Sequence, residues 1–292
     1  MRYAIIDIGT NSIRYMLADY VNGNITSLYR DRENTRLGKG LYDNKNILCD
    51  DRMLASANAV AGFVAHARVN FADKTVCIAT SAVRDASNKY IFASMLKNIA
   101  DVELRILSGN EEAFLGFNGA LGNCKDNNTI LIDIGGGSTE IVERTPNGEI
   151  KGNSFNCGCV RSAETFGEDY SAARAFVEKT LKIPENKNVL LVGGTASTLA
   201  MIYKKLPKYD ESKLHMTVIP SEYIAKLKDQ ILAMSRSERE KLCFFDPKRA
   251  DILPFGLIIL SHIIAVSKSE YVITSEEGLM HGIIRFDAKG LT

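Results

Sequence analysis

Residues 130–140 read Ile-Leu-Ile-Asp-Ile-Gly-Gly-Gly-Ser-Thr-Glu, and this stretch decides the fold. An apolar strand runs into Asp133, the chain turns through three glycines, and it leaves through Ser138 and Glu140. Without Cβ atoms in the way, successive backbone N–H groups in such a loop can converge on an anion such as phosphate. The flanking carboxylates would repel a phosphate unless a divalent cation lay between them, so the stretch predicts a site for phosphate and a hard metal ion. The alternative is a tight glycine hairpin with solvated acids.

Composition restricts the class of protein. With 292 residues and 46% apolar content the chain can bury a large core, and we expect two domains. Its formal charge of +1 provides no overall field for DNA or an anionic membrane. No apolar run is long enough for a membrane span, and the sequence begins directly with a strand at Tyr3, which predicts a cytoplasmic protein. Six cysteines without a regular framework are typical of reduced thiols, and the lone Cys157-x-Cys159 pair lacks the further ligands that a structural zinc needs.

The glycine stretch has a counterpart near the N-terminus. Moving the chain by 126 positions places Ile5–Ser12 on Leu131–Ser138, with the Asp-Ile-Gly core identical. An Asn-Gly hairpin turn follows each copy, at Asn22-Gly23 and at Asn147-Gly148. A unit that recurs once at so long an interval predicts two similar domains whose loops face one cleft.

These motifs resemble a known family. The paired Asp-x-Gly loops are similar to those of the actin, hexokinase and Hsp70 superfold. Within it, the chain resembles the exopolyphosphatase/guanosine pentaphosphate phosphohydrolase (Ppx/GppA) family over nearly its whole length. Four blocks carry this resemblance: Asp7-Ile-Gly-Thr-Asn-Ser12, Thr80-Ser-Ala-Val-Arg-Asp-Ala86, Ser108-Gly-Asn-Glu-Glu-Ala113 and Asp133-Ile-Gly-Gly-Gly-Ser-Thr-Glu140.

The resemblance implies an α/β fold with two actin-like (ribonuclease H-like) domains facing a central cleft. We expect them at residues 1–122 and 123–292, with a last helix at about 276–287 packing back on the first domain. Longer relatives continue into a helical domain of the HD type, which this chain is expected to lack, so long polyphosphates should be processed poorly. A homodimer is also expected from the resemblance.

The implied activity is release of terminal phosphate from inorganic polyphosphate or guanosine pentaphosphate. Mg2+ or Mn2+ would be held by Asp133, Glu140 and Asp7. The terminal phosphoryl group would lie between the two loops, whose expected contacts are Gly9, Thr10, Asn11, Ser12, Gly136, Gly137 and Ser138.

Two further residues are expected to act in catalysis. Arg84 follows a short strand, where an α/β fold places ligands, and its guanidinium fork matches phosphate oxygens. The resemblance assigns activation of the attacking water to Glu111. The spacing Ser108-x-x-Glu111 also predicts a helix capping box, in which Glu111 would have no chemical role, and Glu112 is then the local competitor.

A third phosphate contact is expected where the strand at 189–192 meets a helix at Gly194 and Thr195, because helix N-termini favour anions. These glycines could instead serve close packing. Arg249 precedes a very apolar helix and is expected to face the cleft, the alternative being a solvated helix end. Arg161 could bind substrate or pair with Glu164. Met280 and His281 stand where family members usually carry Arg-Glu, which leaves the contacts of that position open.

Two rival functions remain at this point. A kinase or ATPase of the same superfold would need an adenine pocket, for which the sequence carries no separate signature. A non-catalytic sensor of guanosine tetraphosphate or polyphosphate is compatible with the altered Met280-His281 pair, but the acids at 111, 133 and 140 argue for hydrolysis.

Overall fold

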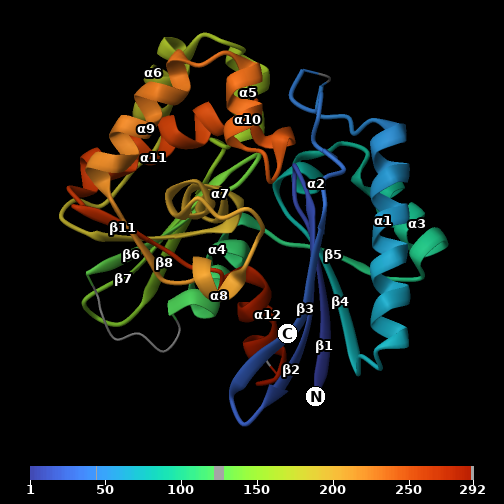
Figure 1. Cartoon of the computed structure of the whole chain (residues 1–292). Coiled ribbons are helices and arrows are strands. Elements are labelled where there is room, and N and C mark those ends of the chain that lie inside the picture. Colours follow the sequence, from blue (N-terminus) through green and yellow to red (C-terminus); the bar gives the residue numbers. More distant parts are fainter. Residues whose placement is uncertain (44, 122–127, 291–292) are drawn as a thin grey trace.

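A computed structural model describes residues 1–43, 45–121 and 128–290, in which the chain forms two β-sheets of matching strand order (Figure 1). The first sheet has the order β3 (Asn24–Glu33), β2 (Ile13–Val21), β1 (Arg2–Ile8), β4 (Lys74–Ala79) and β5 (Leu104–Ile106). The second has β8 (Ile150–Phe155), β7 (Thr139–Arg144), β6 (Thr129–Ile134), β9 (Asn188–Val192) and β11 (Tyr271–Thr274), with β10 (Thr217–Pro220) beyond β11. In both sheets the hairpin strands are antiparallel, whereas β4 and β5 run parallel to β1, and β9 and β11 run parallel to β6. The added edge strand β10 of the second sheet is antiparallel to its neighbour β11. The predicted internal repeat is therefore confirmed.

Burial explains the sequence of the strands. β1 is covered on both faces, and its residues after Arg2 are all buried, which is why it reads as an almost unbroken apolar run. β3 lies at the edge of its sheet, and it is mostly exposed and rich in arginine and acidic residues.

Helices α1 (Asp50–Val69) and α3 (Lys89–Ala100) cover the outer face of the first sheet (Figure 1). On α1 the buried side chains recur every three or four residues, and this stripe packs on the sheet core. The short helix α2 (Ser81–Asp85) directly follows the carboxyl end of β4, and its Ser81 side chain lies against Gly137 of the second half of the chain.

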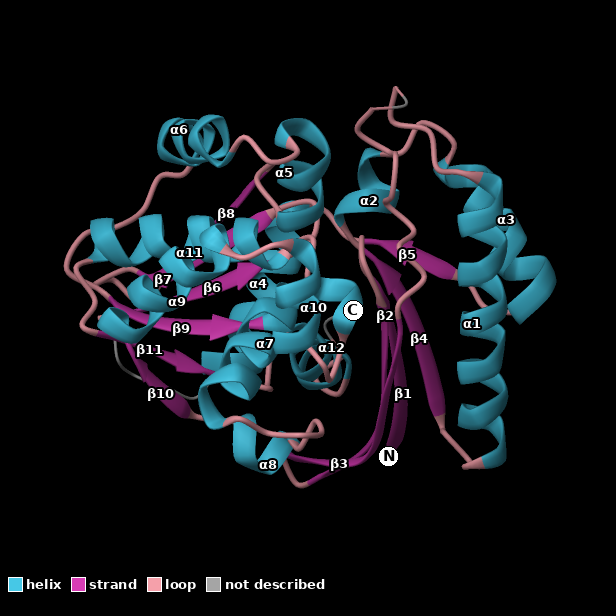
Figure 2. Cartoon of the chain, turned by 45° about the horizontal axis from the view of Figure 1, so that its top comes forward, coloured by secondary structure: helices cyan, strands magenta, loops and turns pink. Residues whose placement is uncertain are grey.

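Two helices lie between the sheets, and each packs on the sheet of the other half of the chain (Figures 1 and 2). α4 (Gly109–Leu121) packs on the second sheet, with Phe117 against Val142 and Leu190, whereas the last helix α12 (Leu279–Asp287) packs on the first sheet. They cross in direct contact, because a Cβ on Gly119 would overlap the backbone of Gly278, and a Cβ on Gly282 would overlap that of Leu115. The domain boundary expected at 122/123 lies outside the described residues.

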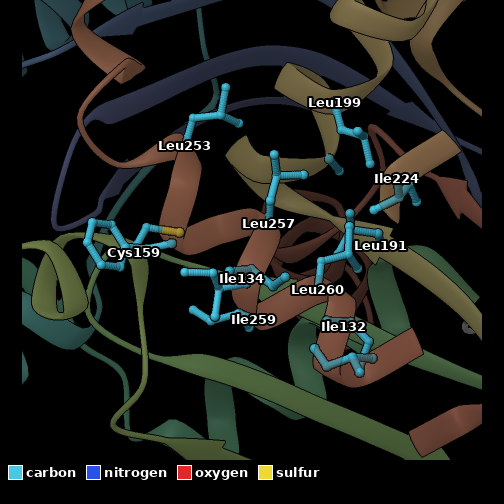
Figure 3. Close-up of a cluster of buried hydrophobic side chains, with 14 of the residues drawn as sticks. Ile132, Ile134, Cys159, Leu191, Leu199, Ile224, Leu253, Leu257, Ile259 and Leu260 are labelled. Atoms are coloured by element: carbon cyan, nitrogen blue, oxygen red, sulfur yellow. The ribbon is translucent and has the colours of Figure 1, made fainter. Parts of the chain in front are cut away.

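The hydrophobic cluster with the most buried residues in the described part of the chain lies on the outer face of the second sheet. The apolar helix α11 (Leu253–Ser267) crosses β6 and β9, where Leu257 and Leu260 meet Ile132 and Leu191 (Figure 3). α7 (Gly193–Lys204) and α9 (Ser221–Ala233) complete this layer. The remaining elements are α5 (Cys159–Phe166), α6 (Tyr170–Thr180), α8 (Glu211–Leu214), α10 (Arg236–Leu242) and the 3-10 turn η1 (Pro247–Arg249).

Two class-level expectations bear on the described residues. None of the helices in this part of the chain is both long and apolar enough to cross a membrane. The five cysteines at 49, 77, 157, 159 and 243 are free thiols.

Candidate active site

The two glycine loops meet at one cavity of about 520 Å³ between the sheets, lined by Gly9–Ser12 from the first loop and Gly135–Ser138 from the second. Their geometry is duplicated, since Gly9 N donates to Ser12 O at 3.1 Å and Gly135 N donates to Ser138 O at 2.9 Å. The loops also touch, because a Cβ on Gly136 would stand 2.8 Å from Thr10 Cβ. The expectation that both loops face one cleft is confirmed.

Four carboxylates surround the loops: Asp7, Glu112 and Glu140 are buried, and Asp133 is half-buried. Burial, and then its neighbour Asp133, raises the pKa of Glu140 to about 7, although hydroxyl donors Ser154 (2.6 Å) and Ser138 (2.7 Å) oppose the shift. Burial likewise raises the pKa of Asp133. A site with this many desolvated acids favours bound protons or cations at neutral pH.

One cation of the site was not anticipated. Arg14 Nη2 lies 2.6 Å from Asp7 Oδ2, and its pKa is raised, chiefly by Asp7. The hairpin register offered the signal, because it pairs Asp7 with Arg14 just as it pairs Asp133 with Glu140 in the second copy. At this position of the repeat, the first sheet has the positively charged Arg14 and the second sheet has the carboxylate of Glu140.

The structure does not bring Glu111 into the cavity. Its side chain is largely exposed and forms the capping box instead: Glu111 Oε2 accepts from Ser108 N and Ser108 Oγ, both at 2.8 Å, and Glu111 N donates to Ser108 Oγ. These bonds lower the pKa of Glu111, the opposite of what a general base requires. Arg105 at 3.1 Å also pairs with it.

Glu112 occupies the place expected for Glu111. It is buried and lines the cavity, and Arg84 Nη1 lies 2.8 Å from its Oε2. Burial and the nearby Glu140 raise the pKa of Glu112, while Arg84 acts in the opposite direction. Arg84 is therefore held beside Glu112 and is not itself among the residues that line the cavity. Glu111 caps the helix and the next residue, Glu112, points into the cavity, and matching the motif alone did not distinguish between them.

Small polar side chains are available in the same cavity. Asn11 Nδ2 and Ser81 Oγ are buried and have no hydrogen-bond partner among the described residues. Both residues line the cavity, next to Thr10 and Ser12. Unpaired buried donors are costly without a ligand, so this wall is suited to an anion that accepts hydrogen bonds.

The third wall comes from α7 and η1. Arg249 is buried, lines the cavity as expected, and donates through Nη1 to Gly194 O at 3.0 Å. Thr195 lines it too, but its hydroxyl donates to Ile134 O at 2.9 Å and so braces the second loop. Arg249 and Arg32 share one acid, Asp246, at 3.3 and 2.8 Å. Burial and then Arg32 lower the pKa of Arg249 to about 10, as in a region with excess positive charge.

The unusual pair at 280–281 belongs to α12 and also lines this cavity. Met280 packs in the core between α12 and the first sheet, and His281 is buried with its Nε2 3.2 Å from Arg30 Nη2. Burial, and then Arg30, lowers the pKa of His281 to about 3, so its ring is neutral at physiological pH. Arg30 instead obtains its negative partner from Glu211 at 2.6 Å.

Of the three predicted metal ligands, Asp7 and Glu140 are buried and Asp133 is half-buried, but the described residues contain no group of three or more His, Cys, Asp or Glu side chains arranged to hold a metal by themselves. Asp7 keeps one oxygen, Oδ1, buried without a hydrogen-bond partner in this part of the structure. Hard carboxylate oxygens with raised pKa values fit Mg2+, which commonly uses one or two carboxylates and completes its shell with water and phosphate oxygens.

Comparison with known proteins gives one consistent result. The model of the Ppx/GppA phosphatase family matches residues 16–289. A bifunctional 3-dehydroquinate synthase/phosphatase of Fusobacterium nucleatum is 30% identical over 96% of this chain, which spans 46% of that protein. Exopolyphosphatase 2 of Mycobacterium tuberculosis is 28% identical, with 97% of each chain covered. A guanosine-5'-triphosphate,3'-diphosphate pyrophosphatase of Pseudoalteromonas atlantica is 27% identical, and the chain spans 58% of it. The crystal structure of an exopolyphosphatase-like protein, 26% identical, superposes over the whole of both chains with a TM-score of 0.88.

Proposed function

Because the chain belongs to the Ppx/GppA phosphatase family, we propose that it hydrolyses the terminal phosphoanhydride bond of inorganic polyphosphate or guanosine pentaphosphate and releases inorganic phosphate. The fold is that of the family, α/β with two actin-like halves facing a cleft. The names of the Mycobacterium and Pseudoalteromonas relatives support the two substrates. The observation that carries the proposal is the meeting of both glycine loops and Glu112 in one cavity. A cytoplasmic location and a homodimer stay predictions.

The terminal phosphoryl group is placed between the two loops. Asn11 and Ser81 supply side-chain donors to its oxygens, and the amides of the second loop supply backbone donors. The phosphates further along the substrate extend toward Arg32 and Arg249. These two arginines share a single carboxylate, Asp246, so the group keeps a net positive charge for the phosphate oxygens.

Glu112 takes the role of general base in this proposal. Its carboxylate accepts a proton from water as the water oxygen attacks the terminal phosphorus, and the bridging oxygen leaves with the shortened chain. Arg84 holds the carboxylate in place at 2.8 Å and favours its ionised form, while burial keeps it basic. Positioning and electrostatics carry most of the catalysis of phosphoryl transfer, so the rigid setting of Glu112 on α4 suits this role.

We further propose that Asp133 and Glu140 hold Mg2+ or Mn2+, with the free Oδ1 of Asp7 on the opposite wall as a third oxygen for the cation or its water shell. The bound cation would supply charge neutralisation for the phosphate oxygens and for the buried acids. Ser138 and Ser154 orient Glu140 for this purpose by donating to its Oε1, which leaves Oε2 available.

A panel of substrates tests the proposal. Phosphate release is measured from tripolyphosphate, guanosine pentaphosphate and ATP in parallel, with Mg2+ and with a chelator. Release from either of the first two, dependent on Mg2+ and faster than from ATP, is expected. Exclusive hydrolysis of ATP would point to an ATPase, and binding of guanosine tetraphosphate without turnover of any member would point to a sensor.

A further inference from the structure

Arg161 lies behind the second glycine loop and joins three parts of the molecule. Its Nε donates to Gly137 O at 2.8 Å, its Nη2 lies 2.6 Å from Asp85 Oδ2, and its guanidinium stacks 3.8 Å from the ring centre of Tyr42. The alternative partner Glu164 is engaged elsewhere, since its Oε1 accepts from Gly40 N at 2.7 Å. Arg161 is absent from the cavity lining, so neither role considered from the sequence describes it.

The carbonyl groups of the three glycines in the second loop are all held from the side of α5. The first turn of α5 donates to them: Cys159 N to Gly135 O at 2.9 Å, Val160 N to Gly136 O at 2.7 Å, and Arg161 N to Gly136 O at 3.0 Å. The remaining carbonyl, Gly137 O, is beyond the reach of these amides and is held by the Arg161 side chain. Helix α5 therefore fixes two peptide planes of the loop through its backbone and the third through one guanidinium.

The orientation of a carbonyl determines where the next amide points. In a planar trans peptide the C=O and the following N–H point in opposite directions. Holding the carbonyls of Gly135, Gly136 and Gly137 against α5 therefore directs the amides of residues 136, 137 and 138 away from α5, toward the cavity that these residues line. The Arg161 contact sets the Ser138 amide in particular.

Both other partners of Arg161 belong to the opposite wall. Asp85 ends α2 and Tyr42 lies in the segment after β3, and both pack with the first sheet. The fit is close, because a Cβ on Gly137 would overlap Tyr42 Oη and Ser81 Oγ. The neighbour of Asp85 is Arg84, which holds Glu112. The short helix α2 thus has two connections. Asp85 pairs with Arg161, which holds the second loop, and Arg84 pairs with Glu112, the proposed base.

We propose that Arg161 is a positioning residue: with Asp85 and Tyr42 in place it aims the Gly137–Ser138 amide at the phosphoryl group, so that the second loop is set only when the two walls are together. This inference rests on the proposed function. Arginine suits the position because its planar fork serves a carbonyl, a carboxylate and an aromatic face at once, whereas the single ammonium of lysine can keep the ion pair but not all three contacts.

Four variants test it: Arg161→Lys, Asp85→Asn, their combination, and Arg174→Lys, an exposed arginine paired with Glu178 on α6, as control. We expect Arg161→Lys to lower kcat for tripolyphosphate by about 10- to 100-fold with little change in KM and a nearly unchanged unfolding midpoint. Asp85→Asn, which contacts neither loop directly, should lower kcat as well, and the double variant should be no worse than the poorer single one. The control should match the wild type.

The results separate two kinds of failure. If the wild type releases phosphate but Arg161→Lys keeps the wild-type kcat, or the losses multiply in the double variant, the positioning role is overturned. If the wild type releases no phosphate from any condensed phosphate, the proposed function fails, and the same cycle is read from urea unfolding with Arg161→Met in place of lysine. A coupling of about tenfold in the unfolding constant is then expected between positions 85 and 161. If the effects of the two substitutions on unfolding are independent, the contact of Arg161 with Asp85 does not join the two walls.

Discussion

Arg84 Nη1 and Glu112 Oε2 are 2.8 Å apart inside the molecule, while the adjacent Glu111 is bonded to Ser108 on its surface. The two glutamates share a helix turn and differ in every property that matters to a base: burial, partner and direction of the pKa shift. They form a natural pair of variants.

Glu112→Gln is expected to lower kcat by about 10²- to 10⁴-fold, because it removes the proton acceptor but keeps the shape and the contact with Arg84. Glu111→Gln should leave kcat within a few-fold of wild type and cost at most about 1 kcal/mol of stability through the weakened cap. Steady-state kinetics on tripolyphosphate and thermal melts measure both. Loss of turnover in Glu111→Gln with an active Glu112→Gln would reverse the assignment.

The raised pKa of Glu140 makes stability depend on pH. Between its ordinary value of 4.5 and about 7 the folded protein holds a proton that the unfolded chain has released, so the free energy of unfolding falls as pH rises through this window. Without divalent cations, wild type should lose roughly 1 to 3 kcal/mol between pH 5 and pH 8 from this group. Glu140→Gln, which cannot ionise, should show a flatter profile in urea unfolding at the two pH values. Parallel profiles would contradict the shift.

Metal binding has a readout that does not require turnover. At pH 8, Mg2+ should raise the melting temperature of the wild type, because it neutralises acids that burial makes costly. The increase should be much smaller in Asp133→Asn, and Asp73→Asn, a change far from the cavity lining, should retain it. An equal Mg2+ effect in all three proteins would place the cation elsewhere.

Arg249 is predicted to bind the phosphates behind the scissile bond. Arg249→Met should lower kcat/KM for tripolyphosphate by about 10- to 100-fold, in line with loss of a charged hydrogen bond of ~1.5–3 kcal/mol. Most of the effect should appear in KM. The exposed Arg236, paired with Glu240 on α10, gives the control Arg236→Met. A fall in kcat alone would mean that Arg249 acts at the reacting phosphorus.

The crossing of α4 and α12 depends on two glycines. Gly119→Ala should destabilise the protein by about 1–3 kcal/mol or more, because the new methyl group meets the backbone of Gly278, which cannot move as a side chain would. Gly62→Ala, at an exposed position of α1 with nothing within 4 Å, should instead stabilise by ~0.5–1 kcal/mol. Urea unfolding compares them, and equal effects would show that the crossing tolerates a wider spacing.

Features that depend on a local sequence pattern or on the internal repeat could be predicted from the sequence. The duplicated sheets, the two facing loops and the inward Arg249 follow from apolar runs, glycine loops and a helix entry. Arg14 was within reach, because the hairpin register sets it opposite Asp7. Glu112 entered only as the local competitor for the role of base, since the matching motif drew attention to its neighbour Glu111, and the capping box at Ser108 was the signal against that neighbour.

Other features depend on contacts between distant residues. The Arg161 junction needs Tyr42, Asp85 and Gly137 to meet, and no spacing in the chain predicts that. The neutral state of His281 follows from burial beside Arg30, a residue on β3 that is 251 positions away in the chain. The packing of a last helix on the first half of the chain was expected from the resemblance alone, and the packing of α4 on the second sheet was not expected, because periodicity specifies neither.

The packing of α12 on the first sheet constrains how the polypeptide is made. The inner face of the first sheet, with Tyr3, Ile5 and Met16, is covered by Leu279, Ile283 and Ile284 of α12. During synthesis these apolar side chains emerge early, and their cover leaves the ribosome more than 260 residues later, as the numbers of Met16 and Leu279 show. This face of the nascent N-terminal segment therefore lacks its native cover until α12 has been made, and apolar surface exposed for so long favours aggregation.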